Sequence, residues 1–368
     1  MLGIPKDQEQ SGFKISRNPQ AELDYKYYGF SEADLNREFY LDTETYSGFL
    51  RQKQIWKLGE IIDKLKMTYC GKAGFEYFHI SDLNERTWLR ERIEELPFKN
   101  VSKEKKLTIL RRLCKNSCLA NFLRQKFPTT TRFSLDGCDT VISGLRAMVY
   151  KASDLDVKRI IFGMAHRGRL NVLTEILGKT YEELMCEFQD NKPMEEHEIS
   201  WGNSGDVKYH LGTTSDYKLE NGKTLRLSML PNPAHLEAVD PLVEGKTRAI
   251  QDYYRETNRD KTIAVSLHGD AGFSAQGVVY ETFQMYDLDD FRVGGTIHVV
   301  IDNQIGFTTT EKEGRSGLYC TEIGKIGEAP IFHVNADEPE LVDQVFELAL
   351  DYRLKFQKNV IVDLIGYR

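Results

Sequence analysis

The stretch SLHGDAGFSAQG (residues 266–277) begins as an apolar run and stops at a carboxylate, Asp270. A second apolar run, IHVVIDNQIGF (residues 297–307), stops in the same way at a carboxamide, Asn303. Both runs have the composition of buried strands, and the span between the two side chains holds one helix and one further strand. Neighbouring parallel strands end at the same edge of a sheet, so the two side chains are expected side by side.

Oxygen-bearing side chains at such an edge suit Mg²⁺, which prefers oxygen ligands and takes some of them from phosphates. Gly269, Gly272 and Gly277 would allow the main chain and a diphosphate to approach each other closely. The alternative is structural, with Asp270 capping a helix and Asn303 shaping a turn. Spacing alone leaves both interpretations open.

Short β-branched runs alternate with helical patterns from about residue 157 onward. We expect strands at 159–165, 224–230, 262–268, 296–302, 331–335 and 359–366, and helices at 169–189, 235–254, 276–287 and 338–357. This alternation is typical of an α/β fold, with a mostly parallel, doubly wound sheet that helices cover on both faces. Ligands of such sheets lie beyond the carboxyl ends of the strands.

The region before this sheet has a different character. Residues 1–45 are polar and lack sustained periodicity, which indicates an extended arm. Residues 46–152 show apolar residues at helical spacing. The expected organisation is therefore an N-terminal arm (1–45), a helical region (46–152) and an α/β domain (153–368).

Composition argues against several classes of protein. The 368 residues carry a formal net charge of −7, which leaves no basic excess to neutralise nucleic-acid phosphates. The apolar runs are too short to span a membrane, and residues 1–20 contain no apolar segment like that of a signal peptide. The one close pair among six cysteines, Cys114 and Cys118, has no histidine nearby that would suggest a metal site. We expect a soluble protein of a reducing compartment, with no nucleic-acid or membrane partner.

Other polar side chains follow the remaining expected strands. Arg167, in AHRGR, stands where a helix begins, and a cation beside a helix N-terminus suits an anion; the alternative is a solvated surface charge. His210 in VKYHLG and His235 in NPAHLE lie in loops at the same sheet edge, where histidines either handle protons or are structural. His268 and His298 lie inside expected strands and are predicted to be buried.

Five motifs occur together and in order: FGMAHRGRLNVL (162–173), GNSGDVKYHLG (202–212), LPNPAHLEAVDP (230–241), LHGDAGFSAQG (267–277) and DNQIGFTT (302–309). This set resembles the thiamine-diphosphate-dependent first component of the 2-oxoglutarate dehydrogenase complex. The resemblance extends from about residue 50 to the last residue and is strongest over 130–368; YCGKAGFEYFHISD (69–82) and RFSLDGCDTVI (132–142) also match. It implies a sheet of the thiamine-diphosphate-binding type.

The resemblance also implies two cofactors, thiamine diphosphate and Mg²⁺. Asp270, Asn303 and the main-chain carbonyl of Ile305 would hold Mg²⁺ against the diphosphate, and Arg167 would contact the diphosphate. The wider superfamily has an Asn-Asn pair where this chain has Asp-Asn, so Asp302 adds a negative charge near the site.

Three histidines are the catalytic candidates that the resemblance implies. His166 would lie at the reacting centre, His210 would bind substrate carboxylates or move protons, and His235 is a weaker candidate. The implied reaction is the oxidative decarboxylation of 2-oxoglutarate, with transfer of the succinyl group to the lipoyl group of the next component. The implied partners are that lipoyl-bearing succinyltransferase component and a second copy of the chain in a homodimer. The implied compartment is the bacterial cytoplasm or the mitochondrial matrix.

Several alternatives remain open at this stage. The sequence shows no counterpart of the family's second α/β domain, which supplies an activating glutamate, or of its C-terminal domain. We therefore expect a fragment that carries the diphosphate and Mg²⁺ half of the site and is nearly inactive alone. GRSGLYCTEIGK (314–325) resembles a 2-oxoadipate paralogue, whereas GDVKYHLG favours 2-oxoglutarate. A non-catalytic binding or assembly module is a further alternative, and a Mg²⁺-dependent nucleotide binder is disfavoured because no phosphate-binding glycine motif follows a strand.

Overall fold

A computed structural model describes residues 21–96, 100–129, 133–188, 210–219 and 222–367. The chain divides into two compact units, Met1–Asn100 and Val101–Arg368. The sequence pattern predicts one helical region over 46–152, whereas this division assigns its helices before and after residue 100 to different units. The helix α4 (Val141–Asp154) belongs to the second unit, where its Gly144 packs so closely on Phe346 that a side-chain carbon would lie 2.6 Å from the ring.

The first unit consists of short helices and a small antiparallel ribbon. Its elements are the 3-10 helices Ala21–Leu23, Tyr25–Tyr28, Glu32–Asn36 and Gly48–Gln52, the strands β1 (Glu38–Tyr40), β2 (Ile55–Lys57) and β3 (Ala73–Glu76), and the helices α1 (Leu58–Tyr69) and α2 (Leu83–Glu95). β1 pairs antiparallel with β2. The arm expected over 1–45 is, in its described part, a run of helical turns followed by β1; residues 1–20 lie outside the described residues.

The strands of the second unit form a mostly parallel sheet in the order β11-β12-β8-β7-β4-β6-β5. Their bounds are β4 (Arg159–Met164), β5 (Thr213–Lys218), β6 (Thr224–Met229), β7 (Thr262–Gly269), β8 (Thr296–Asp302), β11 (Ile331–Asn335) and β12 (Val360–Ile365). Neighbours run parallel except β5, which is antiparallel to β6. β7 and β8 are buried along almost their whole length, which explains why their sequences are nearly continuous apolar runs.

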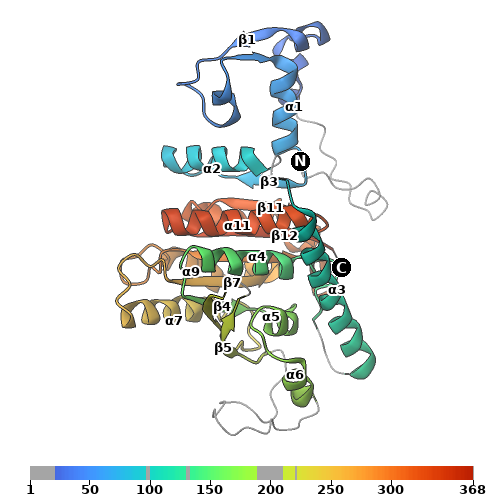
Figure 1. Cartoon of the computed structure of the whole chain (residues 1–368), viewed down its shortest axis with the longest axis vertical. Helices are drawn as coiled ribbons and strands as arrows, with labels where there is room; N and C mark the ends of the chain where they lie inside the picture. Colours follow the sequence, from blue (N-terminus) through green and yellow to red (C-terminus); the bar gives the residue numbers. More distant parts are fainter. Residues whose placement is uncertain (1–20, 97–99, 130–132, 189–209, 220–221, 368) are drawn as a thin grey trace. The chain divides into compact units, whose positions relative to one another are not determined.

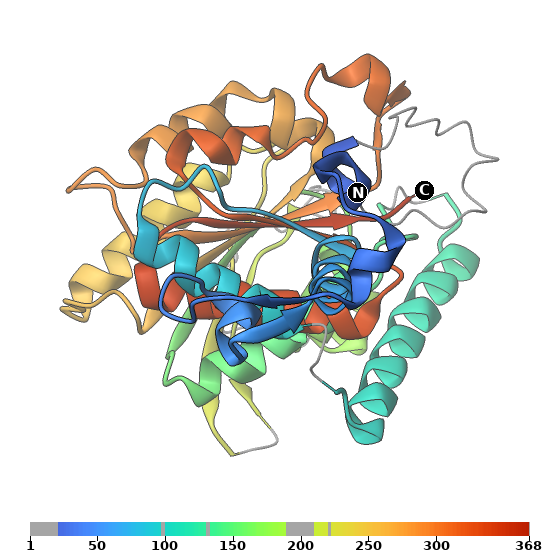
Figure 2. The ribbon, with the colours of Figure 1, turned by 90° about the horizontal axis from the view of Figure 1, so that it is seen from above.

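Helices cover both faces of this sheet (Figure 1). The helices that this unit has besides α4 are α3 (Lys103–Lys126), α5 (Arg169–Glu175), α6 (Tyr181–Phe188), α7 (Asp240–Tyr253), α8 (Asp270–Ala275), α9 (Gly277–Met285), α10 (Glu311–Gly314), the 3-10 helix Glu322–Gly327 and α11 (Pro339–Phe356). One face packs on α7 through Val239 and Val243, and on α8 and α9 through Phe273 and Phe283. Figure 2 shows α4 and α11 on the other face. Among the residues that the structure describes, no helix is both long and apolar enough to cross a membrane.

The α/β class predicted from sequence is confirmed, and all six expected strands agree with the structure within one residue at each end. β5 was not predicted, because its sequence TTSDYK is polar and only alternate residues are shielded. The helix expected over 169–189 is two helices, since Gly178 interrupts it with a φ of 77°. The helix expected from 235 begins at Asp240, because Glu237 adopts a left-handed conformation with a φ of 65°.

Candidate functional site

Three adjacent strands end at one edge of the second unit. β7 lies between β4 and β8, and all three run parallel. Asp270 begins α8 directly after β7, and Asn303 directly follows β8. The chain leaves β4 for β6 on one side and returns to β7 on the other. This edge is therefore the switch point of the sheet, which is where α/β proteins bind ligands.

The buried side chains of Asp270 and Asn303 are in contact. One terminal atom of the Asn303 amide lies 3.3 Å from Oδ1 of Asp270 and 3.2 Å from the main-chain oxygen of Ile305. With the amide nitrogen in this position, Asn303 donates to both oxygens, and its oxygen accepts from Nε of Arg167 at 3.2 Å. With the amide turned over, three oxygens converge on one point, which is the donor set of a hard cation.

The main chain around Ile305 is held in an unusual conformation. Gln304 and Phe307 have left-handed φ angles of 62° and 59°, and between them β9 (Ile305–Gly306) turns back on β10 (Thr309–Thr310). Non-glycine residues adopt this conformation at a cost, and they concentrate at functional sites. The turn carries the Ile305 carbonyl to the Asn303 amide.

The three glycines that the sequence pattern groups together have different surroundings. A side-chain carbon on Gly269 or Gly277 would meet no atom within 4 Å, so the space beside them is open to a ligand. On Gly272 it would lie 2.6 Å from Oε1 of Glu237. A glycine is thus required at 272 for packing against Glu237, whatever lies on the other side of the main chain.

Arg167 reaches the same cluster from the end of β4. Its Nη1 donates to the main-chain oxygen of Ser134 at 3.0 Å, and its Nε lies 3.2 Å from the Asn303 amide. Gly168, at a φ of 75°, follows it and begins α5. The positive charge of Arg167 therefore lies directly beside the three oxygens. If a metal cation bound to these oxygens holds an anionic ligand, the guanidinium can balance part of the ligand's charge.

His166 and His210 lie next to each other. Their ring centroids are 5.2 Å apart, and Phe133 contacts the His166 ring at 5.5 Å. Burial, followed by the nearby His210, lowers the pKa of His166 below its usual value. At neutral pH His166 is consequently a neutral imidazole, which can donate one hydrogen bond and accept another.

His235 is placed differently from the other two histidines. Its loop is tied to His210, because the main-chain nitrogen of Asn232 donates to the His210 oxygen at 3.0 Å. The His235 side chain itself is exposed. A main-chain hydrogen bond is therefore the link between the His235 loop and His210.

Arg169, in the same AHRGR motif, is completely buried and joins three segments of main chain. Its Nε donates to the Leu211 oxygen at 2.9 Å and its Nη1 to the Met164 oxygen at 2.7 Å. Its Nη2 donates to the Leu230 oxygen. The guanidinium thus fixes the ends of β4 and β6 to the residue after His210, and sequence reasoning missed this role.

Arg315 is a second residue that sequence reasoning missed. It follows α10, and its side chain is 11 % exposed. Nη1 lies 3.4 Å from Oδ2 of Asp270, and Nη2 lies 3.8 Å from Oδ2 of Asp302. Burial raises the pKa of Asp270, and the charge of Arg315 opposes this rise. The signal in the sequence was an arginine within GRSGLYCTEIGK, a stretch that we interpreted as evidence on the choice between 2-oxoglutarate and 2-oxoadipate.

Two buried histidines connect the strands β7 and β8 to Glu237, in the segment before α7. Nδ1 of His268 lies 2.6 Å from Oε2 of Glu237, and its Nε2 lies 3.0 Å from Nδ1 of His298. Both histidines are 1 % exposed, as predicted, and His298 also stacks on Phe283 with ring centroids 4.6 Å apart. The hydrogen bonds fix the direction in which the His268 ring points, two residues before Asp270.

Glu244, on α7 beside this network, gives a testable dependence of stability on pH. Burial raises its pKa to about 7 from the usual 4.5. A carboxyl group whose pKa is raised by folding favours the folded state below its unfolded pKa, and this contribution is lost as pH rises through the folded value. Glu244→Gln removes the charge and can still accept from the Thr296 hydroxyl, which lies 3.0 Å from Oε1. We expect it to raise the free energy of unfolding by about 2 kcal/mol at pH 8 and by far less at pH 4.5.

Urea denaturation at the two pH values measures this difference. The exposed Glu281→Gln variant is the control, and it should leave stability unchanged at both. A gain from Glu244→Gln of equal size at pH 4.5 and pH 8 would contradict the explanation.

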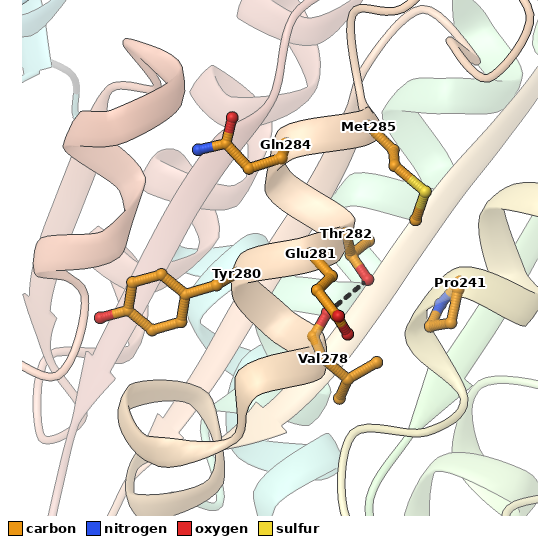
Figure 3. A pocket seen from close by; sticks show the side chains of 7 residues that line it. All are labelled: Pro241, Val278, Tyr280, Glu281, Thr282, Gln284 and Met285. Atoms are coloured by element: carbon orange, nitrogen blue, oxygen red, sulfur yellow. Dashed lines mark hydrogen bonds between the residues drawn. The ribbon is translucent and has the colours of Figure 1, made fainter.

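A surface cavity lies beside the start of α7 and along α9 (Figure 3). It has a volume of about 590 Å³ and is lined by Pro241 at the start of α7 and by Val278, Tyr280, Glu281, Thr282, Gln284 and Met285 of α9. The residues clustered around Asp270 and Asn303 are not among its lining residues.

The sequence has clear relatives among known proteins. Residues 118–368 match the dehydrogenase E1 component family. The chain is 44% identical over 358 residues to the mitochondrial 2-oxoglutarate dehydrogenase of Dictyostelium discoideum, which covers 97% of this chain and 35% of that protein. It is 41% identical over 348 residues to the mitochondrial 2-oxoglutarate dehydrogenase of Caenorhabditis elegans, covering 94% and 33%. It is 42% identical over 343 residues to the mitochondrial 2-oxoglutarate dehydrogenase-like protein of Pongo abelii, covering 93% and 33%.

The fold and the edge described above define an α/β protein with a polar ligand site at the switch point of a parallel sheet. The family match extends over that entire sheet, and the chain belongs to the dehydrogenase E1 component family. Within it, the chain is similar to 2-oxoglutarate dehydrogenases, as the five motifs predicted. The chain spans about one third of the length of these curated relatives.

Proposed function

We propose that the second unit binds the diphosphate of thiamine diphosphate together with Mg²⁺, as the anchoring part of a 2-oxoglutarate dehydrogenase first component. The observation that carries this proposal is the cluster formed by Asp270 Oδ1, the Asn303 amide and the Ile305 carbonyl, with separations of 3.2 to 3.3 Å. A single negative charge and two neutral oxygens leave coordination positions for phosphate oxygens, which is how Mg²⁺ is commonly held in proteins.

The surrounding residues fit a diphosphate. Arg167 supplies a positive charge next to the cluster, and the open space beside Gly269 and Gly277 leaves room for an anion near the main chain. Thiamine diphosphate supplies the electron sink that decarboxylation of a 2-oxo acid requires. The task of Asp270, Asn303, Ile305 and Arg167 is then to fix one end of the cofactor.

We assign His166 and His210 to the substrate. Both rings are half-buried and adjacent, at a centroid distance of 5.2 Å. The lowered pKa keeps His166 neutral near pH 7, so one ring nitrogen can donate a hydrogen bond to a carboxylate and the other can accept a proton. His235 is exposed, whereas the other two histidines are half-buried, and it stays the weakest candidate of the three.

The wider activity is proposed from the relatives. They are named 2-oxoglutarate dehydrogenases of mitochondria, so we propose oxidative decarboxylation of 2-oxoglutarate in the mitochondrial matrix. The corresponding partners are a lipoyl-bearing succinyltransferase component, which takes the succinyl group, and a second copy of the chain in a homodimer.

Calorimetry on the 368-residue chain tests the anchoring role. Thiamine diphosphate is titrated into the protein with Mg²⁺ and, separately, with EDTA. We expect binding that requires Mg²⁺, because the diphosphate and the three oxygens share the cation. ADP with Mg²⁺ serves as the control for a general nucleotide site and should not bind. An absence of Mg²⁺-dependent binding, as expected of a pure assembly module, would overturn the proposal.

A further inference from the structure

We infer that Arg315 is a positioning residue for the cation site: it holds Asp270 so that only one carboxylate oxygen faces Asn303 and Ile305. This inference rests on the proposed function of the site. It adds a residue that none of the sequence motifs assigned to the metal or the cofactor.

The two oxygens of Asp270 have different partners. Oδ1 lies 3.3 Å from the Asn303 amide, and Oδ2 lies 3.4 Å from Nη1 of Arg315. The planar guanidinium is shielded from solvent and spans two carboxylates, so it fixes a direction as well as a charge. Rotation of the Asp270 carboxylate about its terminal bond would break the contact with Arg315.

The negative charges near this point explain why an arginine is needed. Asp302, which Arg315 also contacts, is 2 % exposed. Cys320 lies between Asp302 and Asp363. The Sγ of Cys320 is 3.7 Å from Oδ2 of Asp302 and 3.8 Å from Oδ1 of Asp363. Without a cation at position 315, Oδ2 of Asp270 would lose its contact with Nη1 at 3.4 Å, and the carboxylate would be free to turn.

Arg315 comes from the segment after β8, as Asn303 and Ile305 do, and not from the segment of Asp270. It lies beyond the β9–β10 hairpin, at the end of α10, and its Nη2 is 3.9 Å from Oε2 of Glu311 in that helix. The same Nη2 therefore lies near two carboxylates, those of Asp302 and Glu311. The segment after β8 therefore contributes twice to the site, through the Ile305 carbonyl and through the guanidinium that orients Asp270.

The test compares Mg²⁺ affinity in variants of the 368-residue chain. With saturating thiamine diphosphate, the Mg²⁺ dissociation constant is measured by calorimetry, and Mn²⁺ binding is followed by electron paramagnetic resonance as a second readout. Arg315→Met should raise the dissociation constant about 10-fold or more, which is the size expected when a partner of a metal ligand is removed. Arg315→Lys, which keeps the charge but cannot span two carboxylates, should raise it less.

Arg292→Met is the matched control. Arg292 also lies 3.4 Å from an aspartate, Asp289, but its side chain is 46 % exposed, so its loss should not change Mg²⁺ affinity. If Arg315 served only the stability of the fold, Arg315→Met would lower the melting temperature and leave the Mg²⁺ dissociation constant unchanged.

The outcomes separate the two proposals. If the unsubstituted chain shows no Mg²⁺-dependent binding, the proposed function fails and the inference fails with it. If the unsubstituted chain binds and Arg315→Met binds Mg²⁺ equally well, the inference alone is overturned. Should Arg315→Met not fold, an unchanged dissociation constant in Arg315→Lys overturns it in the same way.

Discussion

Replacing Asp270 with alanine should abolish the Mg²⁺-dependent binding of thiamine diphosphate by this chain. Of the three oxygen donors at the strand ends, only the Asp270 carboxylate carries a negative charge. The Asn303 amide and the Ile305 carbonyl are neutral and cannot hold a strongly hydrated divalent cation without it. We expect the dissociation constant of thiamine diphosphate, measured by calorimetry in the presence of Mg²⁺, to rise on the order of 100-fold or more, beyond the loss expected at Arg315.

The control for Asp270→Ala is Asp289→Ala. Asp289 is 90 % exposed and is paired with an arginine at the same distance of 3.4 Å, but it lies on the surface. The Asp289→Ala variant should bind thiamine diphosphate with the same dissociation constant as the unsubstituted chain. If Asp270→Ala retained full affinity while remaining folded by circular dichroism, Asp270 would merely cap α8, which is the structural alternative that the sequence left open.

The position of Asp270 beside Asn303 could be predicted because the information is local. Each side chain directly follows a buried apolar run, and parallel strands that are adjacent must end at the same edge. The period of the apolar residues was sufficient to place β7 and β8 within one residue of their bounds. The order of the strands, which makes β7 and β8 neighbours, followed from the short span between them.

Arg315 and Arg169 could not be predicted because their roles depend on contacts between distant segments. Arg315 contacts a carboxylate 45 residues earlier in the chain, across the β9–β10 hairpin. Arg169 stands in the AHRGR motif, but its three acceptors are main-chain oxygens of residues 164, 211 and 230. Main-chain acceptors leave no trace in a sequence, since every residue has a carbonyl group.

The departures from the expected helices share a physical reason. Glu237 was expected within a helix, whereas it adopts a left-handed conformation that directs its carboxylate to His268 at 2.6 Å. A buried hydrogen bond outweighs the modest cost of that backbone conformation. Helical propensity is a weak preference by comparison, so the chain forms the tertiary contact and α7 begins three residues later, at Asp240.

The Arg169→Met variant should be strongly destabilised, with a loss of about 3–5 kcal/mol in the free energy of unfolding. Methionine has a similar length but no donors, so the carbonyl oxygens of Met164, Leu211 and Leu230 would lose the donor that Arg169 gives each of them. Each acceptor left without a partner in a buried place costs about 1–3 kcal/mol. Arg169→Lys should recover part of the loss, because an ammonium group can reach some of these oxygens but lacks the planar fork.

Urea denaturation measures this effect, with Arg248→Met as the matched control. Arg248 also donates to two main-chain oxygens, those of Asp289 and Arg292, both at 3.1 Å, but at the surface. Water replaces the lost donor there, and the expected loss is below about 1 kcal/mol. Arg169 joins β4, which precedes His166, to the residue after His210, so the site depends on this buried cation for its two histidines to remain adjacent. A loss for Arg169→Met as small as that of the control would mean that packing alone holds the two segments together.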